Sequence, residues 1–389
     1  MDLENNEAEK LHESINPNDE LNITNIEDTP PKKKLPFICV MLFALGSISG
    51  LLYILFVCIP AFSDFFNKYI SSVLRAALAH LTSWIPFSLA EYIFLLLPVI
   101  TVVLISIGIK HYASSWRNVG VFCLIILSVG AYIFSTFTIG FVPAYRGSRL
   151  DAKMGLDKQK VSADDLYLTA TILAEKIDAE IDEIKFSSDG SSVMPYGYDE
   201  MGDKLMAAYD KACDKYGFIQ PLDSKVKRVM LSEPMTYTHI SGVYTFFTGE
   251  ANINVNFPDY TLPNTAAHEL AHQRGIARED EANFVAFLVC SESDDAYLRY
   301  SAYLSLYEHV ISALYSADRD YYVSAYLELP KEARGELAAF SKFFSKYKNS
   351  VASDVSGTVN DTFLTVNGTE GSKSYGMVVD LAVAYYKAD

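Results

Sequence analysis

Two histidines and a glutamate between residues 268 and 272 are the side chains of this sequence best suited to chemistry. They form the pattern His268-Glu269-Leu270-Ala271-His272. Residues four apart lie on one face of an α-helix, so both imidazoles can reach one ion. Neutral imidazole suits zinc, and Glu269 beside it would act as general base on a water molecule. The pattern predicts a zinc site that hydrolyses peptide bonds.

The residues around the pattern favour the helix that it requires. Pro263 suits the first helical turn, where a missing N–H costs nothing, and Ala266 and Ala267 are strong helix formers. Gly275 is a natural stop. The sequence therefore predicts a helix over residues 263–274 that carries both histidines.

A third metal ligand is expected shortly after this helix, because a catalytic zinc usually has three protein ligands and one open position. Gly275 lets the chain reverse into a second helix that opens with three consecutive acids. Glu279 lies one turn before the apolar stripe of that helix, so we expect it to be the third ligand, with Glu281 as the alternative. Asn283 lies one turn beyond Glu279, where it would orient a ligand through a hydrogen bond.

Other polar residues admit two interpretations. His239 would stabilise the oxyanion of a tetrahedral intermediate or be a hydrogen-bonded structural histidine, and the structural role is favoured. His309 is expected to pack within a helical layer. Tyr260, Tyr300 and Tyr303 would each be able to donate to an oxyanion, and the sequence does not choose among them.

Three uncharged apolar runs precede the motif, and each is long enough for the roughly 20 residues that a membrane crossing needs. We expect transmembrane helices over about residues 36–60, 92–110 and 119–141. They form a membrane domain, residues 35–145, in contact with the lipid bilayer. Residues 1–34 are interpreted as a disordered, acidic cytoplasmic tail.

The basic residues predict the orientation of these spans. Lys32, Lys33 and Lys34 precede the first span, and Lys110 and Arg117 flank the loop between the second and third. The positive-inside rule places both segments in the cytoplasm, so the chain after residue 146 would be extracytoplasmic. The expected protein is a multi-pass cell-membrane protein, and its net charge of −16 argues against a nucleic-acid partner.

Residues 146–389 are expected to form a mostly helical zinc metallopeptidase-like domain. Ser162 and Asp165 make a capping box before one helix. Strands are predicted at residues 226–232, 243–247, 251–257 and, with a turn, 362–368. An extended substrate commonly adds to a strand beside the motif helix in zinc peptidases. The predicted fold class is α+β: three transmembrane helices, then a zincin-like domain with a small β-sheet and an HExxH helix.

Several segments resemble the membrane-anchored bacterial family named "domain of unknown function 3810". The likeness covers most of the chain: the three spans, YRGSRLDAKMGL after the third, SGVYTFFTGEANINVN, HELAHQRG, YLRYSAYLSL, and SYGMVVDLAVAYY near the end. Members of that family are regarded as zinc metallopeptidases, which implies zinc as cofactor and hydrolysis of peptides as activity.

The helix that begins at Glu279 is also similar to the E-x-x-A-[DN]-x-x-A helix of gluzincins, whose first glutamate binds zinc. This resemblance implies Glu279 as a ligand. The spacing departs from the pattern, because Glu279 lies only seven residues past His272. It is closer to the compact H-E-x-x-H-x-x-G-x-x-H of metzincins, with Gly275 in the glycine place. Arg278, which is no zinc ligand, stands in the third-histidine place.

Two functions follow from these observations. The first is a membrane-bound, gluzincin-like zinc metallopeptidase that cleaves a peptide or protein close to the membrane, with Glu269 as general base. The alternative is a zinc-binding membrane receptor or scaffold without turnover. The glutamate beside His268 favours the first, because a site that only binds metal needs no general base.

Overall fold

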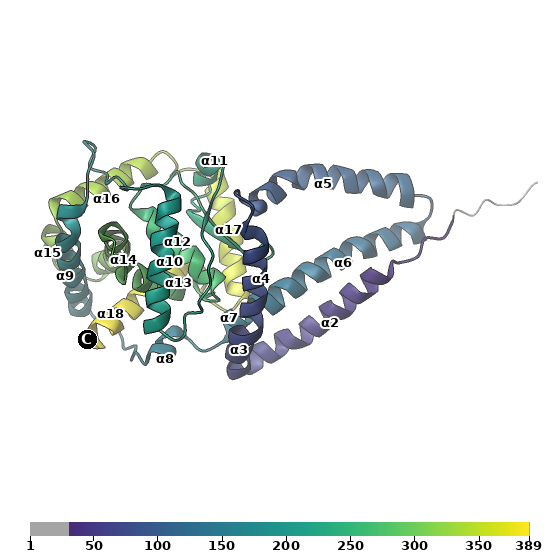
Figure 1. Cartoon of the computed structure of the whole chain (residues 1–389), viewed down its shortest axis with the longest axis horizontal. Helices are drawn as coiled ribbons and strands as arrows, with labels where there is room; N and C mark the ends of the chain where they lie inside the picture. Colours follow the sequence, from purple (N-terminus) through teal and green to yellow (C-terminus); the bar gives the residue numbers. More distant parts are fainter. Residues whose placement is uncertain (1–30, 389) are drawn as a thin grey trace, which may run out of the picture.

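The computed structural model describes residues 31–388 and shows a mostly helical protein in two parts. Three apolar helices project from one side of a bundle of helices (Figure 1). The bundle also contains a small sheet. The expected tail, residues 1–34, lies almost wholly outside the described residues. The first part corresponds to the apolar segment of the sequence, and the second to the segment after it, in which apolar and polar residues are mixed.

The three long helices are long and apolar enough to cross a membrane. They are α2 (Phe37–Cys58), α5 (Leu89–Tyr112) and α6 (Trp116–Gly140), with mean hydropathies of 2.3, 2.7 and 2.2. At a rise of about 1.5 Å per residue, each exceeds a hydrocarbon core of about 30 Å. The helix α5 starts earlier than expected because the Ser88 hydroxyl caps it, accepting from the Glu91 amide at 3.1 Å.

The spans are not packed equally against one another. Gly46 of α2 lies against Ala131 of α6, where an added Cβ would be 3.2 Å from the alanine methyl. By contrast, α5 contacts α6 through Tyr112 and Phe122, whose ring centroids are 5.1 Å apart, near the loop that joins the two helices. Figure 1 shows α5 diverging from α6 towards the helical bundle.

Short helices connect the spans to the bundle. Between the first two spans lie α3 (Pro60–Phe66), the π-helix η1 (Asn67–Ser71) and α4 (Ser72–Ser83). After the third span come α7 (Val142–Arg146) and α8 (Leu150–Met154). In Figure 1, α3, α4 and α7 lie between the long helices and the bundle. These short helices therefore connect the long apolar helices to the bundle.

The bundle is built around three buried helices: α12 (Thr261–Gln273), α13 (Glu279–Ser291) and α14 (Ala296–Ala317). The helices packed around them are α9 (Ala163–Glu180), α10 (Tyr198–Lys215), α15 (Arg319–Glu328), α16 (Lys331–Phe344) and α18 (Val378–Ala388). The short elements η2 (Ile181–Glu183), α11 (Ser232–Thr236) and η3 (Gly371–Met377) connect them. The capping box of Ser162 and Asp165 is present at the start of α9.

The sheet has three short strands in the order β1-β3-β2. Strand β1 (Lys227–Arg228) pairs parallel with β3 (Glu250–Ile253), and β2 (Gly242–Thr245) pairs antiparallel with it, with Val243 opposite Asn252. The central strand β3 is fully buried, whereas β2 is an edge strand. The strands are shorter than the sequence predicts.

The predicted strand at residues 362–368 is wrong. This segment belongs to α17 (Val351–Val366), which begins where the Ser350 side chain caps the Ala352 amide at 3.1 Å. Threonine and valine are frequent in strands, but an N-terminal cap and an uninterrupted helical run outweigh that preference here. Only the end of the segment is a turn, at Gly368, whose φ is +86°.

Candidate metal centre

The two histidines of the motif lie side by side on α12. The helix ends at Gln273, close to its predicted end, and the ring centroids of His268 and His272 are 4.6 Å apart. Both side chains are largely buried, with 11% and 9% of their side-chain surface exposed. One face of α12 therefore presents two imidazoles to a single point.

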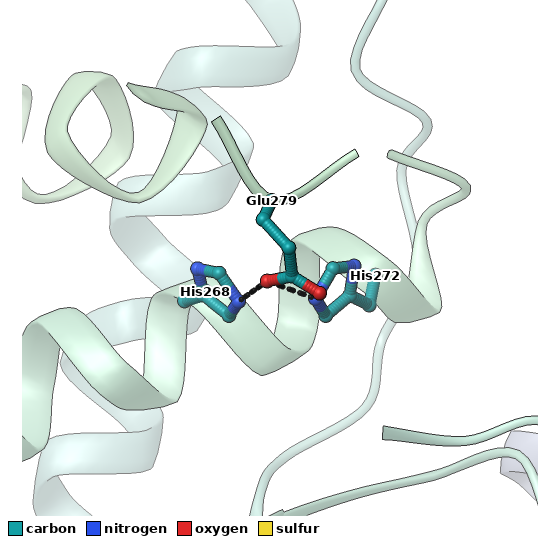
Figure 2. A group of neighbouring side chains, drawn as sticks. All are labelled: His268, His272 and Glu279. Atoms are coloured by element: carbon teal, nitrogen blue, oxygen red, sulfur yellow. Dashed lines mark ion pairs between the residues drawn. The ribbon is translucent and has the colours of Figure 1, made fainter. Parts of the chain in front are cut away.

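The third member of the cluster comes from the next helix. Gly275 has a φ of +87°, which lets the chain reverse between α12 and α13. Glu279 is the first residue of α13, and its Oε2 lies 3.1 Å from Nε2 of His268 and 3.6 Å from Nε2 of His272. Figure 2 shows the carboxylate between the two rings. One ligand atom from each residue lies within 4.8 Å of the others.

The structure does not bring Glu281 to this cluster. Its Oε1 accepts the Leu150 amide at 3.0 Å and Arg278 at 3.1 Å. Arg278 in turn donates to the carbonyl of Tyr145 at 2.8 Å. Glu281 thus attaches the start of α13 to the segment that follows the third span, and Glu279 alone of the two faces the histidines.

The charges within the cluster depend on each other. Burial opposes charge on His272, but the Glu279 carboxylate raises its pKa to about 9. Burial likewise works against the Glu279 carboxylate, yet the two imidazoles hold its pKa well below its usual range. His272 Nδ1 lies 2.7 Å from the Ile276 carbonyl, so it donates there and leaves Nε2 to face Glu279. The cluster favours a positive charge, which a proton or a divalent cation can supply.

Glu269 is a buried carboxylate beside the cluster. Burial raises its pKa, and its Oε2 has no hydrogen-bond partner among the described residues. The Tyr244 amide of β2 donates to it. A Cβ added to Gly242 would lie 2.6 Å from Glu269 Oε1, so only glycine lets the edge strand approach this closely. Glu269 therefore lies between the cluster and strand β2.

Residues near the membrane spans hold the turn between α12 and α13, residues 274–278, which we call the metal turn. Asn67 donates to the Gly275 carbonyl at 3.0 Å, and buried Arg75 donates to the Gly140 carbonyl at the end of α6 at 2.7 Å. The Arg75 guanidinium also lies directly against Gly275 and leaves no space for a Cβ. Burial lowers the pKa of Arg75 to about 10. Sequence analysis missed this contact, although a lone arginine among small and apolar residues was a signal for it.

A cavity of about 820 Å³, which we call the metal cavity, contains the cluster. Its walls include Glu269, the edge strand β2, and Phe141 and Tyr145 just past the third span. The helix α17 covers it with its small and polar face, from Ser353 to Asn360. The nitrogen and oxygen atoms of the cluster therefore face a partly open space between the bundle, the end of a span and α17.

The remaining candidate residues are placed as follows. His239 lines the cavity, but its Nε2 bonds the Tyr347 carbonyl at 2.8 Å, which fits a structural role. Among the described residues no hydrogen bond joins Asn283 to a ligand, although it lines the cavity one turn from Glu279. Tyr260 donates to half-buried Glu308 and Tyr300 to buried Glu336, and neither tyrosine lines this cavity.

His309 also lines the cavity, and burial lowers its pKa. Tyr303 packs its ring against Phe287, with centroids 6.3 Å apart, and does not reach the cavity. Within residues 31–388, the three tyrosines considered for an oxyanion role therefore lie outside the metal cavity.

The comparisons with known proteins give one result. No curated protein and no solved structure matches this chain. A family model described as "Protein of unknown function (DUF3810)" matches residues 62–383, from α3 through most of α18. The match covers the metal cluster, the metal turn and both later spans, so the chain belongs to the DUF3810 family.

Proposed function

We propose that this protein is a membrane-bound, zinc-dependent metallopeptidase with a zincin-like catalytic domain. The observation that supports it most is the meeting of His268, His272 and Glu279 beside the partner-free carboxylate oxygen of Glu269. A metal site and a general base in one cavity are the two parts that metal-assisted hydrolysis requires.

The donor set suits zinc. Two imidazoles and one carboxylate give three ligands and leave a position open, as in catalytic zinc sites. The hydrogen bond from His272 to the Ile276 carbonyl is the kind that fixes the tautomer of a metal-binding histidine. When bound there, zinc would supply Lewis-acid chemistry that makes water acidic and polarises a carbonyl.

Glu269 would do the proton transfer. Burial raises the pKa of Glu269, which makes its carboxylate a stronger base towards a water molecule than an exposed glutamate would be. The Tyr244 amide holds one side of the carboxylate and fixes its orientation. Glu269 would then pass the proton that it takes from water to the leaving amine of the cleaved peptide.

The edge strand β2 would hold the substrate. Ser241 and Val243 pair with Asn254 and Asn252 of the central strand, so the main-chain groups of Gly242 and Tyr244 face away from the sheet. The Tyr244 amide donates to Glu269, which leaves the main-chain groups of Gly242 and the Tyr244 carbonyl for a substrate. Within the described residues no other strand covers that edge. An extended peptide that added to β2 would pass directly over Glu269. This edge strand, rather than the buried strand at 250–253, is the one beside the catalytic glutamate.

The site lies close to the membrane spans, which supports a substrate near the bilayer. Phe137 of α6 contacts Phe246 at the tip of the β2–β3 hairpin and Phe363 of α17, with ring centroids 5.0 and 5.8 Å apart. Phe246 and Phe363 also line the metal cavity. With the cytoplasmic end of the spans assigned by the positive-inside rule, the domain would face the outside of the cell.

The test uses the full chain in detergent micelles, because residues 67–140 help to hold the metal turn. We expect one zinc per chain and cleavage of an unstructured protein such as casein. Glu269→Gln should keep the zinc and lower the rate about 10²- to 10⁴-fold, the usual contribution of a general base.

The matched control for this variant is Glu328→Gln, an exposed change on α15 remote from the cavity, which should alter neither zinc content nor rate. Zinc binding without any turnover would favour the receptor or scaffold. A folded wild type that binds no zinc would overturn the proposal.

A further inference from the structure

A second cavity, of about 570 Å³, opens beside the metal cavity. The two share five lining residues: Ser241, Asn264, Thr265, Asn283 and His309. These come from the approach to β2 and from each of the three central helices, α12, α13 and α14. A ligand that occupies the metal cavity can therefore extend a side chain into the second cavity without leaving protein contact.

The second cavity contains a carboxylate that has no cationic partner. Glu308 of α14 accepts a hydrogen bond from the Tyr260 hydroxyl at 3.2 Å, and among the described residues no lysine or arginine forms an ion pair with it. Burial is the main cause that raises its pKa, to about 7, and nearby Glu336 adds to the effect. A half-buried carboxylate without a counter-charge is partly desolvated, and a cation brought by a ligand would offset that cost.

The other polar groups of the cavity favour the same kind of ligand. Asn264 lies one turn before His268, and its Oδ1 is buried without a hydrogen-bond partner. His309 is not a competing cation, because burial, and secondarily the charge of His268, lower its pKa. Lysine and arginine side chains carry only donors, and this cavity offers them a carboxylate and an amide oxygen as acceptors.

We propose that the second cavity binds a lysine or arginine side chain of the substrate, with Glu308 as the residue that determines this specificity. The inference rests on the proposed peptidase function and adds a substrate class to it: peptides with a basic residue close to the bond that is cut. The shared lining residues place that side chain one or a few residues from the metal cluster.

The experiment measures cleavage and binding separately. Cleavage by the zinc-loaded full chain is measured on quenched peptides that differ at one position, which holds arginine, lysine, citrulline, leucine or glutamate. Binding of fluorescent arginine and citrulline peptides is measured by anisotropy with the zinc-loaded Glu269→Gln protein. Citrulline keeps the shape of arginine and lacks its charge, so the pair isolates the ionic contact.

We expect the arginine peptide to be cleaved and bound at least about tenfold better than the citrulline peptide, which is the usual strength of a hydrogen bond to a charged group. Glu308→Gln should remove that preference. The control is again Glu328→Gln, because Glu328 also accepts from a tyrosine hydroxyl, that of Tyr167 at 2.6 Å, but lies outside both cavities.

The outcomes separate this inference from the proposed function. Cleavage of all peptides without a charge preference would overturn the basic-residue site and leave the peptidase intact. Absence of cleavage would count against the peptidase, while a Glu308-dependent preference in binding would still uphold the site. Equal binding of the two peptides, or binding of neither, would overturn it.

Discussion

The floor and the roof of the metal cavity differ in how they are held. The floor, α12 with the metal turn and the start of α13, is buried almost throughout and is bonded to the segments around the spans. The roof, α17, has Leu364 as its single buried residue, and Val351, Val355 and Val359 are 79, 60 and 64% exposed. The groups that need exact geometry lie in the floor, and the element that limits access is packed lightly, as in mobile elements of other proteins.

The largest effect on zinc affinity is expected from removing one of the proposed metal ligands in the floor. Glu279→Gln should lower zinc affinity by more than about a hundredfold, since even residues that only support ligands are worth 10–100-fold. The measurement is zinc retained by the full chain against a competing chelator.

Glu281→Gln is the matched change for this ligand test. The Glu281 carboxylate accepts a hydrogen bond from the Leu150 amide and does not face the histidines, so this variant should retain zinc. If zinc were lost with Glu281→Gln and kept with Glu279→Gln, the third ligand would be Glu281 and the described geometry would not be that of the metal-bound protein.

A pair of glycines compares the floor and the roof directly. Gly275→Ala should lower stability by about 2–4 kcal/mol, because an alanine at positive φ costs about 1–2 kcal/mol and its methyl would overlap Arg75. Gly357→Ala in α17 meets nothing within 4 Å and should raise helix stability by up to about 1 kcal/mol. Thermal unfolding of the two variants, with and without zinc, measures both effects. Equal effects would show that floor and roof are held alike.

The contacts of Asn67 and Arg75 with the metal turn, which we call the clamp, can be weakened without changing a proposed metal ligand. Arg75→Met leaves the Gly140 carbonyl without its donor and frees the space against Gly275. We expect zinc affinity to fall about 10–100-fold, the range for residues that support ligands. Lys68→Met, an exposed change on the neighbouring η1, is the control. Unchanged affinity in Arg75→Met would mean that the turn holds its shape alone.

The smallest expected effect is the pH dependence contributed by Glu308. Its pKa is raised from 4.5 to about 7 in the folded chain, so the folded state holds the proton more tightly than the unfolded state. The stability it contributes is therefore complete below pH 4.5 and is lost as pH rises to about 7. Between pH 5 and 8 the free energy of unfolding, obtained from thermal melts, should fall less in Glu308→Gln than in wild type, by on the order of 1 kcal/mol. Parallel curves would show that Glu336 or His309, which lie near it, controls this range.

Sequence alone predicted the parts of the site that depend on near neighbours. Two histidines at a spacing of four, a proline near the start and a glycine after the end define α12 because helix geometry is local. The same geometry favoured Glu279 over Glu281, since only one of two residues on adjacent faces can point back. The apolar spans could also be predicted from the sequence, because length and hydropathy are properties of a continuous segment.

The parts that sequence did not predict depend on distant residues. Asn67 and Gly275 are 208 positions apart, and no periodicity connects them. The segment at residues 362–368 was assigned to a strand because its threonine and valine content was weighed without the cap at Ser350. The choice of β2 as the edge strand depended on a strand order that can only be seen once the sheet is formed.

The clamp between Asn67, Arg75 and the metal turn has a consequence for the timing of assembly. Chain synthesis runs from the N-terminus, so both clamping residues leave the ribosome about two hundred residues before Gly275 does. The first spans can enter the bilayer while the histidines are still to be made. A chain that failed to insert would lack the contacts that shape the turn, so the proposed hydrolytic centre would stay incomplete. Membrane insertion would then be a safeguard against proteolysis in the wrong compartment.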